Sequence, residues 1–510
     1  MAFSCQFLFL FGLALVGLTS GRALNTDEDV SPRIGIIGAG IGGTSSAFFL
    51  RQLYGPKVTI DVFETEKVGG RTTNIRINAQ DYEAGGTIIH KKNKYMVELA
   101  RKFNLTAYDN RGGILGLWAE DGIRLQTSEW TAITLAKLVW RYGMDLYTAR
   151  HWINNIGFKQ FSRIYEFQDR GMAFTTVEDM LRAMGDDLLN MTRYTMNEAL
   201  RGIGLSQTFI DEYAAAAVKD NYGQTVEANG FLGVVSLMAV QPELWSIQDG
   251  NKRMAEILLR ESKANLVKGT VNTVALIRDD LGTGGVSYEL DYIKGNDKKN
   301  TESKEYDIVI VAAPLNEQTK NKISFAEFPR DVVSFKQEYH KLVSMFVQGK
   351  INATSFNVGS QQECPDEVIT ITPNYFFNSV KKVSPVSPNT EPETPFKAEE
   401  AIWRVFFNKN PTQEEISKLF ESHSDLRLVD WWAYPEYRAG MDLPPFMLYD
   451  RLYYVNAVES AASAMETAVI GGRNVALLAF NQWHGNFDKI DEVQLPSLAS
   501  SSGDAEKSEL

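Results

Sequence analysis

The chain has 510 residues and a formal net charge of −12 at pH 7. An acidic balance of this size argues against a protein that binds the phosphates of nucleic acids. The hydrophobic fraction of 44% and the charged fraction of 23% are those of an ordinary globular protein. Because the chain is longer than one hydrophobic core supports, we expect two or more domains or interleaved lobes.

An apolar run near the start of the chain predicts a secretory signal peptide over residues 1–21. The run, residues 7–18, is shorter than the roughly 20 residues that span a bilayer. We therefore expect no transmembrane segment, which leaves peripheral contact with a membrane open. Cleavage would leave Cys364 as the only cysteine and a soluble lumenal or secreted protein, and Asn-x-Ser/Thr sequons predict glycosylation at Asn104, Asn190 and Asn352.

The first elements after the leader predict a complete βαβ unit. Residues 33–37 are a β-branched run typical of a buried parallel strand, and a glycine-rich string follows at residues 38–43. Residues 44–53 predict a helix that ends at Gly55 and Pro56. Residues 58–63 predict a second strand, which closes with Glu64.

The glycine string and the acid after the second strand predict a dinucleotide site. Gly38 allows a tight turn, Gly40 lets the backbone approach the pyrophosphate, and Gly43 lets the helix pack on the strand. Ala39 belongs to the same cofactor-binding turn, and the positive end of the helix would face the phosphates. Glu64 would accept hydrogen bonds from the adenosine ribose.

The rest of the chain predicts a helical segment followed by strands. Residues 130–220 are mostly helical, and strands at residues 286–293 and 306–312 flank a polar loop at residues 294–305. The proline-rich residues 384–395 predict a surface loop. A last strand at residues 452–455 and a helix at residues 463–483 precede a disordered tail.

These elements predict an α/β fold, a Rossmann-type FAD-binding domain with an interleaved mixed α+β substrate domain. The FAD-binding domain is discontinuous and would comprise residues 32–110, 240–325 and 445–490. The substrate-binding lobe would comprise residues 111–239 and 326–444, and the tail residues 491–510.

Two further motifs indicate that the dinucleotide is FAD. The string KVGGR at residues 67–71 and the string YEAGGT at residues 82–87 follow the acid, as in FAD enzymes of the glutathione-reductase and amine-oxidase type. In that group the arginine, here Arg71 after Gly70, lies against the pyrophosphate. The glycine pair, here Gly85 and Gly86, lets the backbone approach the isoalloxazine ring.

The C-terminal end supports the same cofactor. In the amine-oxidase group a strand-end acid, here Glu459, binds the flavin ribityl chain. The helix that begins near Met465 would direct its N–H groups to the pyrimidine oxygen. Val271 is also counted among the cofactor-binding residues. Since residues 282–285 predict a hairpin turn rather than a second nucleotide site, molecular oxygen is the expected electron acceptor.

Several strings resemble the prenylcysteine oxidase family, and together they reach from about residue 33 to residue 485. They stand at residues 37–45, 82–90, 244–245, 306–309 and 450–466, of which GIGGTS at residues 40–45 and AASAME at residues 461–466 are distinctive. The resemblance implies an FAD-dependent oxidase that cleaves the thioether of farnesyl- or geranylgeranylcysteine to a prenyl aldehyde, cysteine and hydrogen peroxide. One departure is Asp249, which stands where the family pattern leads us to expect glycine.

The substrate site is less sharply predicted than the cofactor site. His90 follows the glycine pair and is the candidate catalytic or substrate-steering side chain, with a structural role as the alternative. Trp245, Trp432 and Tyr434 are candidates for the pocket wall, with core packing as the alternative. The apolar residues 231–237 line a prenyl groove or form an ordinary buried helix. No catalytic triad or metal site is expected.

Two other functions share parts of this pattern. A polyamine or amino-acid oxidase would use the same cofactor residues with a charged pocket. A non-enzymatic prenyl-binding escort, like the Rab escort and GDP-dissociation-inhibitor proteins, would share the fold without a working flavin. The resemblance implies lysosomal residence, whereas the final KSEL resembles the KDEL retrieval signal for the endoplasmic reticulum.

Overall fold

A computed structural model describes residues 31–108, 113–241, 243–278, 285–295, 300–387, 391–394, 396–397 and 399–495. The signal peptide prediction and most of the predicted tail, residues 496–510, lie outside the described residues. So does the turn predicted at residues 282–285, except for Gly285. The strands on either side of that turn pair antiparallel up to the Arg278 and Val286 pair.

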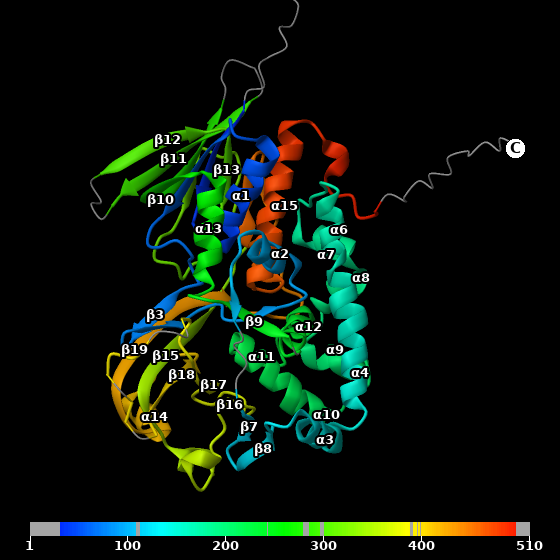
Figure 1. Ribbon diagram of the computed structural model, residues 1–510. Coiled ribbons are helices and arrows are strands. Elements are labelled where there is room, and N and C mark those ends of the chain that lie inside the picture. Colours follow the sequence, from blue (N-terminus) through cyan, green and yellow to red (C-terminus); the bar gives the residue numbers. More distant parts are fainter. Residues whose placement is uncertain are drawn as a thin grey trace, which may run out of the picture. The chain divides into compact units, whose positions relative to one another are not determined.

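A nine-stranded sheet carries the predicted dinucleotide fold (Figure 1). Its centre is parallel, in the order β10-β2-β1-β13-β21, and antiparallel strands extend it at both ends. Strands β1 and β13 at the centre are buried along nearly their whole length, which agrees with their runs of Ile and Val. The strands are β1 (Arg33–Ile37), β2 (Thr59–Glu64), β10 (Asn265–Arg278), β11 (Val286–Lys294), β12 (Thr301–Tyr306), β13 (Ile308–Val311), β14 (Ser324–Ala326), β20 (Met447–Tyr449) and β21 (Leu452–Tyr454).

Three helices pack together beside this sheet (Figure 1). Helix α1 (Ile41–Tyr54) contacts both α13 (Lys252–Ser262) and α15 (Met465–Trp483). Gly55 ends α1 with a φ of 77°, a left-handed conformation that glycine adopts without strain. The β1–α1–β2 unit and the final strand and helix are therefore confirmed, and the fold is a mixed α/β fold with a Rossmann-like domain.

A second sheet of seven strands has the order β19-β15-β18-β17-β16-β7-β8. All its neighbours pair antiparallel except β16 and β7. The first five strands of this order come from the region after residue 330, whereas β7 and β8 come from the region before the helical segment. The strands are β7 (Leu115–Ala119), β8 (Gly122–Gln126), β15 (Tyr339–Ile351), β16 (Glu367–Thr370), β17 (Ser379–Lys382), β18 (Ala401–Phe407) and β19 (Phe420–Pro435), and helix α14 (Gln413–Leu419) precedes β19.

The helical segment lies between β8 and β9 in the sequence, as predicted (Figure 1). Helix α12 is buried nearly all round, because Phe231, Leu232, Val234 and Leu237 are buried and Val235 is half-buried. These residues pack as core. The helices are α3 (Thr131–Tyr142), α4 (Asp145–Trp152), α5 (Lys159–Phe161), α6 (Arg163–Asp169), α7 (Val177–Met184), α8 (Asp186–Met191), α9 (Met196–Gly202), α10 (Gln207–Phe209), α11 (Ala215–Tyr222) and α12 (Gly230–Ala239), with π-helical turns η1 (Ile153–Phe158) and η2 (Ile210–Ala214).

Short elements connect these parts. Strands β3 (Asn74–Ile77) and β4 (Gln80–Glu83) form a hairpin, and β9 (Leu244–Ile247) lies between β5 (Ile89–His90) and β6 (Ala107–Tyr108). Helix α2 (Lys94–Lys102) contacts α15, and 3-10 turns occur at η3 (Ala353–Phe356), η4 (Gln361–Glu363), η5 (Val455–Ser460) and η6 (Phe487–Lys489).

Two predictions about irregular segments are wrong in part. Residues 301–305 were expected in a polar loop but form most of β12, an edge strand paired with β11. Its charged, exposed side chains conceal the strand in the sequence, while cross-strand pairs such as Lys294 with Glu302 favour it. The tail was expected to begin at residue 491, yet Asp491 accepts hydrogen bonds from the Thr175 N–H and hydroxyl, both at 2.7 Å.

The predicted surface features can be located on the described residues. Of residues 384–395, the described ones form neither helix nor strand. Asn104 and Asn190 are exposed, whereas Asn352 is half-buried and its side-chain amide donates to the Lys418 carbonyl at 3.1 Å. Among the described residues, no helix is long and apolar enough to cross a membrane.

Candidate cofactor and active site

The glycine turn after β1 leaves space where a dinucleotide phosphate is expected. A Cβ on Gly38, whose φ is 110°, would lie 2.6 Å from the Ala312 carbonyl oxygen, and one on Gly43 would lie 2.0 Å from the Gly38 oxygen. A Cβ on Gly40 would meet only the Gly69 oxygen, at 4.0 Å. Packing therefore requires glycine at positions 38 and 43, whereas Gly40 borders open space.

The N-terminus of α1 opens onto the same space. Gly40 is the N-cap residue, no side chain caps the helix, and its first turn contains no acidic residue. Free N–H groups and the positive end of the helix dipole together favour an anion at this point. These observations fit a bound phosphate.

Glu64 ends β2 beside this turn. Its Oε2 accepts a hydrogen bond from the Ala39 N–H at 2.9 Å, and its Oε1 accepts one from the Glu66 N–H at 2.7 Å. Gly70 approaches from the next loop, where a Cβ would lie 3.3 Å from the Gly40 Cα. Glu64, Ala39, Gly40 and Gly70 thus lie around one turn, as the sequence predicts.

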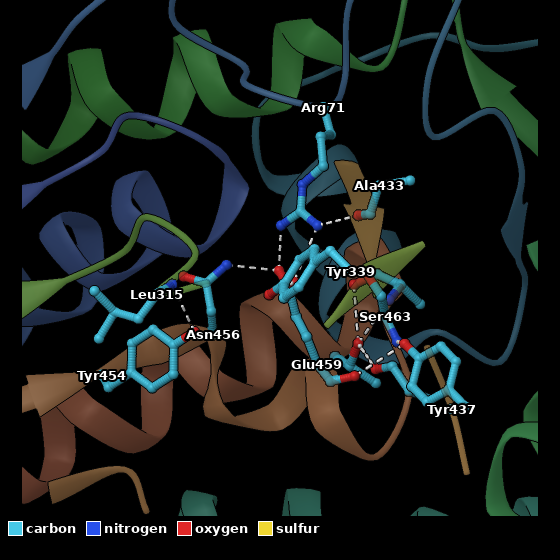
Figure 2. A network of polar contacts seen from close by, with 12 residues as sticks. Arg71, Leu315, Tyr339, Ala433, Tyr437, Tyr454, Asn456, Glu459 and Ser463 are labelled. Carbon is cyan, nitrogen blue, oxygen red and sulfur yellow. Dashed lines mark hydrogen bonds and ion pairs between the residues drawn. The ribbon is translucent and has the colours of Figure 1, made fainter. Parts of the chain in front are cut away.

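Arg71 and Glu459 form a bidentate ion pair across a sequence separation of 388 residues (Figure 2). Arg71 Nη1 donates to Glu459 Oε2 at 3.0 Å, Nη2 contacts Oε1, and Nη1 also donates to the Ala433 carbonyl. Burial lowers the pKa of Arg71, but the Glu459 charge and hydrogen bonds outweigh it and raise the pKa. The sequence assigned both residues to the cofactor but did not predict that they pair.

Three further side chains hold Glu459 in place (Figure 2). The Tyr339 hydroxyl donates to Glu459 Oε2 at 3.1 Å, and the Asn456 amide donates to Oε1 at 2.7 Å. The Tyr437 hydroxyl donates to the Glu459 carbonyl at 2.9 Å. Sequence reasoning missed all three, and only the position of Asn456, one turn before the predicted acid, gave a signal.

The glycine pair lies against the start of α15. A Cβ on Gly85 would lie 1.8 Å from the Arg71 carbonyl oxygen, so no side chain fits there. A Cβ on Gly86 would lie 3.4 Å from Met465 Cγ. The predicted ring-contacting glycines and the first residue of the last helix are therefore neighbours.

The departure at Asp249 is accommodated in the structure. Asp249 adopts a φ of 67°, in the left-handed region that glycine favours. Its carboxylate accepts hydrogen bonds from Arg253 at 2.8 Å and Ser387 at 2.6 Å. The following Asn251 donates to the Gly86 and Thr87 carbonyls at 2.8 and 2.9 Å, so the loop still supports the glycine pair.

His90 and Trp245 lie together at the β5 and β9 pair. His90 is buried, its Nδ1 accepts the Lys92 N–H at 3.0 Å, and its ring stacks on Phe158 with centroids 5.1 Å apart. Trp245 is buried opposite Ile89. These contacts suit local packing, and the catalytic role of His90 stays a prediction.

The other candidate residues occupy different surroundings. Trp432 is 38% exposed, and instead Trp431 approaches the glycine pair, with its Cη2 3.1 Å from a Cβ placed on Gly85. Tyr434 is buried against Tyr222, and its hydroxyl has no hydrogen-bond partner in the described part of the chain. Val271 is buried in β10 next to a bulge, opposite Tyr292.

Comparison with known proteins agrees with the motifs. The family model described as prenylcysteine lyase matches residues 125–492, and a model of the NAD(P)-binding Rossmann-like domain matches residues 36–103. The chain is 39% identical to prenylcysteine oxidase 1 of Mus musculus over 494 residues, which is 96% of each chain. The chain belongs to the prenylcysteine lyase family. Another member, prenylcysteine oxidase 1-like of Bos taurus, is 32% identical over 94% of this chain and 97% of its own.

Solved structures of two amine oxidases resemble the fold of this chain. Cyclohexylamine oxidase from Brevibacterium oxydans has a TM-score of 0.55 with 14% identity, covering 89% of this chain and 100% of its own. A putrescine oxidase has a TM-score of 0.53 with 12% identity, covering 88% of this chain and 98% of its own. This prenylcysteine lyase family member therefore has the fold of flavin amine oxidases, with a dinucleotide-binding Rossmann-like domain.

Proposed function

We propose that the chain is an FAD-dependent prenylcysteine oxidase. It would convert a farnesyl- or geranylgeranylcysteine, oxygen and water into the prenyl aldehyde, free cysteine and hydrogen peroxide. The observation that carries the proposal is the 39% identity to a prenylcysteine oxidase over 96% of the chain. The function would serve the degradation of prenylated proteins.

The residues around the glycine turn fit FAD. The open space at Gly40 and the uncapped N-terminus of α1 suit the pyrophosphate, and Glu64 suits the adenosine ribose. Arg71 and Glu459 are the predicted partners of the pyrophosphate and the ribityl chain. When bound, FAD supplies a hydride acceptor that passes its electrons on to oxygen.

The chain's own contribution would be orientation and electrostatics rather than strong acid–base catalysis. Met465 and the N-terminus of α15 lie at Gly86, where the positive helix end favours negative charge on a neighbouring ring. Glu466 fixes this end of α15, since its carboxylate accepts the Tyr95 and Met96 N–H groups of α2 at 2.8 and 2.9 Å.

An absorbance spectrum followed by anaerobic titration with farnesylcysteine tests the proposal. We expect flavin bands that bleach on addition of farnesylcysteine and return with oxygen, with farnesal and hydrogen peroxide released in equal amounts. Turnover of polyamines or amino acids but not farnesylcysteine would favour the alternative oxidase. Folded protein that binds farnesylcysteine but no flavin would favour the escort.

Peripheral contact with a membrane is part of the proposal. It is supported by exposed apolar side chains on and next to α3 and α4, namely Trp130, Ile133, Leu135, Val139, Trp140, Met144 and Tyr147. Trp140→Ser should weaken binding to phosphatidylcholine–phosphatidylserine vesicles, whereas Phe487→Ser, which alters an exposed aromatic residue elsewhere, should not. Equal binding of both variants would contradict a role for this surface.

We also propose that the protein is a glycosylated resident of the lysosome, with partial retrieval to the endoplasmic reticulum. The family's substrate class and the sequons at Asn104, Asn190 and Asn352 support this address. Removing residues 507–510 should shift the protein toward the lysosome or the medium while leaving farnesylcysteine turnover in extracts unchanged. Identical distribution of both forms would contradict retrieval.

A further inference from the structure

One buried arginine of the chain lacks an ion pair among the described residues. Arg404 on β18 is 6% exposed, and its Nε has no hydrogen-bond partner among the residues that the structure describes. Its Nη1 donates to the Thr87 hydroxyl at 2.9 Å, and its guanidinium lies 4.4 Å from the centroid of the Phe406 ring. Within the described residues, no carboxylate forms an ion pair with it.

The neighbouring acids do not compensate this charge. Burial lowers the pKa of Arg404, although the charges of Asp220, Glu367 and Glu83 act in the opposite direction. Glu367 is already paired with Lys381 at 3.0 Å, and Glu83 and Asp220 have pKa values raised by burial. A buried cation without a matched anion is costly unless a ligand supplies one.

Two further buried polar atoms lack a hydrogen-bond partner among the described residues. They are Oδ1 of Asp220 on α11 and the hydroxyl of Tyr434 on β19. Asp220 stands two residues before Tyr222 on α11, and the Tyr222 ring packs on Tyr434 with centroids 5.1 Å apart. A cation, an acid and a hydroxyl from three elements are thus each left with a free hydrogen-bonding atom.

This group lies next to the residues predicted to contact the flavin ring. The Thr87 hydroxyl that accepts from Arg404 itself donates to the Gly85 carbonyl at 2.9 Å. The Tyr222 ring packs on Tyr434, and its hydroxyl donates to the Ser463 carbonyl, two residues before α15, at 2.9 Å. The free groups therefore border both the glycine pair and the start of the last helix.

We propose that Arg404 binds the α-carboxylate of the thioether substrate and that Asp220 binds its α-ammonium group. The inference rests on the proposed function, because a prenylcysteine carries both groups. In that substrate, Cα, Cβ and sulfur alone separate the carboxylate carbon from the carbon that loses hydride. An anchor for the amino-acid end must therefore lie close to the ring, and Arg404 does so through Thr87.

Three thioethers separate the two contacts: farnesylcysteine, 2-(farnesylthio)ethylamine, which lacks the carboxylate, and 3-(farnesylthio)propionate, which lacks the ammonium group. In the holoenzyme, Arg404→Gln should lower kcat/KM about 100-fold for farnesylcysteine and the propionate and far less for the ethylamine. Asp220→Asn should lower kcat/KM for farnesylcysteine and the ethylamine and far less for the propionate.

Lys381→Gln is the matched control, because Lys381 is the cross-strand neighbour of Arg404 and already has an acidic partner. It should leave the ratio of kcat/KM between the three thioethers unchanged. An equal change of that ratio in Lys381→Gln, an equal loss on all thioethers in Arg404→Gln, or no loss at all would overturn the assignment.

If Arg404→Gln does not fold, kcat/KM values of the wild-type enzyme for the three thioethers still test the inference. Wild-type kcat/KM should fall about 100-fold from farnesylcysteine to the ethylamine, and equal values would overturn the role of Arg404. If the wild-type holoenzyme converts none of the thioethers, the proposed function fails and the inference fails with it. Turnover without discrimination contradicts the inference alone.

Discussion

Two arginines of this chain, the half-buried Arg71 and the buried Arg404, differ in what surrounds them. Arg71, beside the glycine turn, is paired with Glu459, and the Tyr339 hydroxyl and Asn456 amide satisfy the same carboxylate. Arg404, on β18 of the seven-stranded sheet, donates to one hydroxyl and forms no ion pair within the described part of the chain. Both lie next to the glycine pair, one through its carbonyl and one through Thr87.

The difference distinguishes Arg71, whose ion pair stabilises the folded chain, from Arg404, whose charge a bound substrate would neutralise. The Arg71 pair joins the second glycine-rich loop to the C-terminal 3-10 turn, so its energy is part of the folded chain. The charge of Arg404 is desolvated without an equivalent gain, which native proteins retain where a bound group completes the contacts. Four experiments test the cofactor site and the charges around the two arginines, from the largest expected effect to the smallest.

Gly40→Asp should abolish FAD binding. The new carboxylate would enter the open space beside Gly40 and repel the pyrophosphate from the N-terminus of α1. Flavin absorbance per folded protein measures the effect, and circular dichroism establishes folding. Gly202→Asp is the control, because no atom lies within 4 Å of a Cβ at this exposed residue. Stoichiometric FAD in Gly40→Asp would refute the site.

Glu459→Gln and Arg404→Met should affect stability in opposite ways. Glu459→Gln leaves Arg71 without its anion and should lower the free energy of unfolding by about 3 kcal/mol. Arg404→Met removes an unpaired charge and should keep the free energy of unfolding within about 1 kcal/mol of wild type, or raise it. Denaturant unfolding of both variants measures the difference. Equal losses would mean that Arg404 has an ionic partner in solution.

Glu83→Gln should flatten the dependence of stability on pH. Burial raises the pKa of Glu83 from 4.5 to about 8, although the Asn251 N–H and the charges of Arg404 and Lys252 lower it. A carboxyl with a raised pKa stabilises the fold below its ordinary pKa, and this stability is lost as the pH rises toward the folded value. Between pH 5 and pH 7, wild type should lose roughly 2 kcal/mol more than the variant.

The comparison for Glu83 is made by denaturant unfolding at each pH. Glu98→Gln serves as the control, because Glu98 is exposed on α2. Its stability should vary with pH as in wild type. Parallel profiles for wild type and Glu83→Gln would mean that Glu83 is ionised throughout this range.

Glu64→Ala should weaken FAD binding by about 1.5 kcal/mol, roughly tenfold in the dissociation constant, without changing turnover at saturating FAD. The loss is modest because the Glu64 side chain is half-exposed and one hydrogen-bond acceptor is removed. Glu66→Ala, two residues further on, is the control, and titration of the apoprotein with FAD measures both. An unchanged dissociation constant would show that the ribose does not contact Glu64.

The cofactor end of the molecule was predictable because its signals are local. Residues 33–64 contain a strand, a glycine turn, a helix and a second strand in the order of a βαβ unit, and packing leaves no room for a Cβ on Gly38 or Gly43. The edge strand β12 escaped prediction, since its charged side chains give no alternation of buried and exposed residues. Trp431 and Trp432 are adjacent in the sequence. Because successive side chains of a strand point to opposite faces of the sheet, only one of them can reach Gly85, and only the structure shows that it is Trp431.

The sequence by itself determined the Rossmann-like fold, the glycine turn with Glu64, and the acid and helix that complete the site at the C-terminal end. The tertiary structure alone decided which charges find partners. Arg71 meets Glu459 across 388 residues, and Arg404 meets Thr87 across 317. No pattern of spacing or periodicity encodes such contacts, because the packing of distant strands and helices determines whether a buried charge is neutralised or left for a ligand.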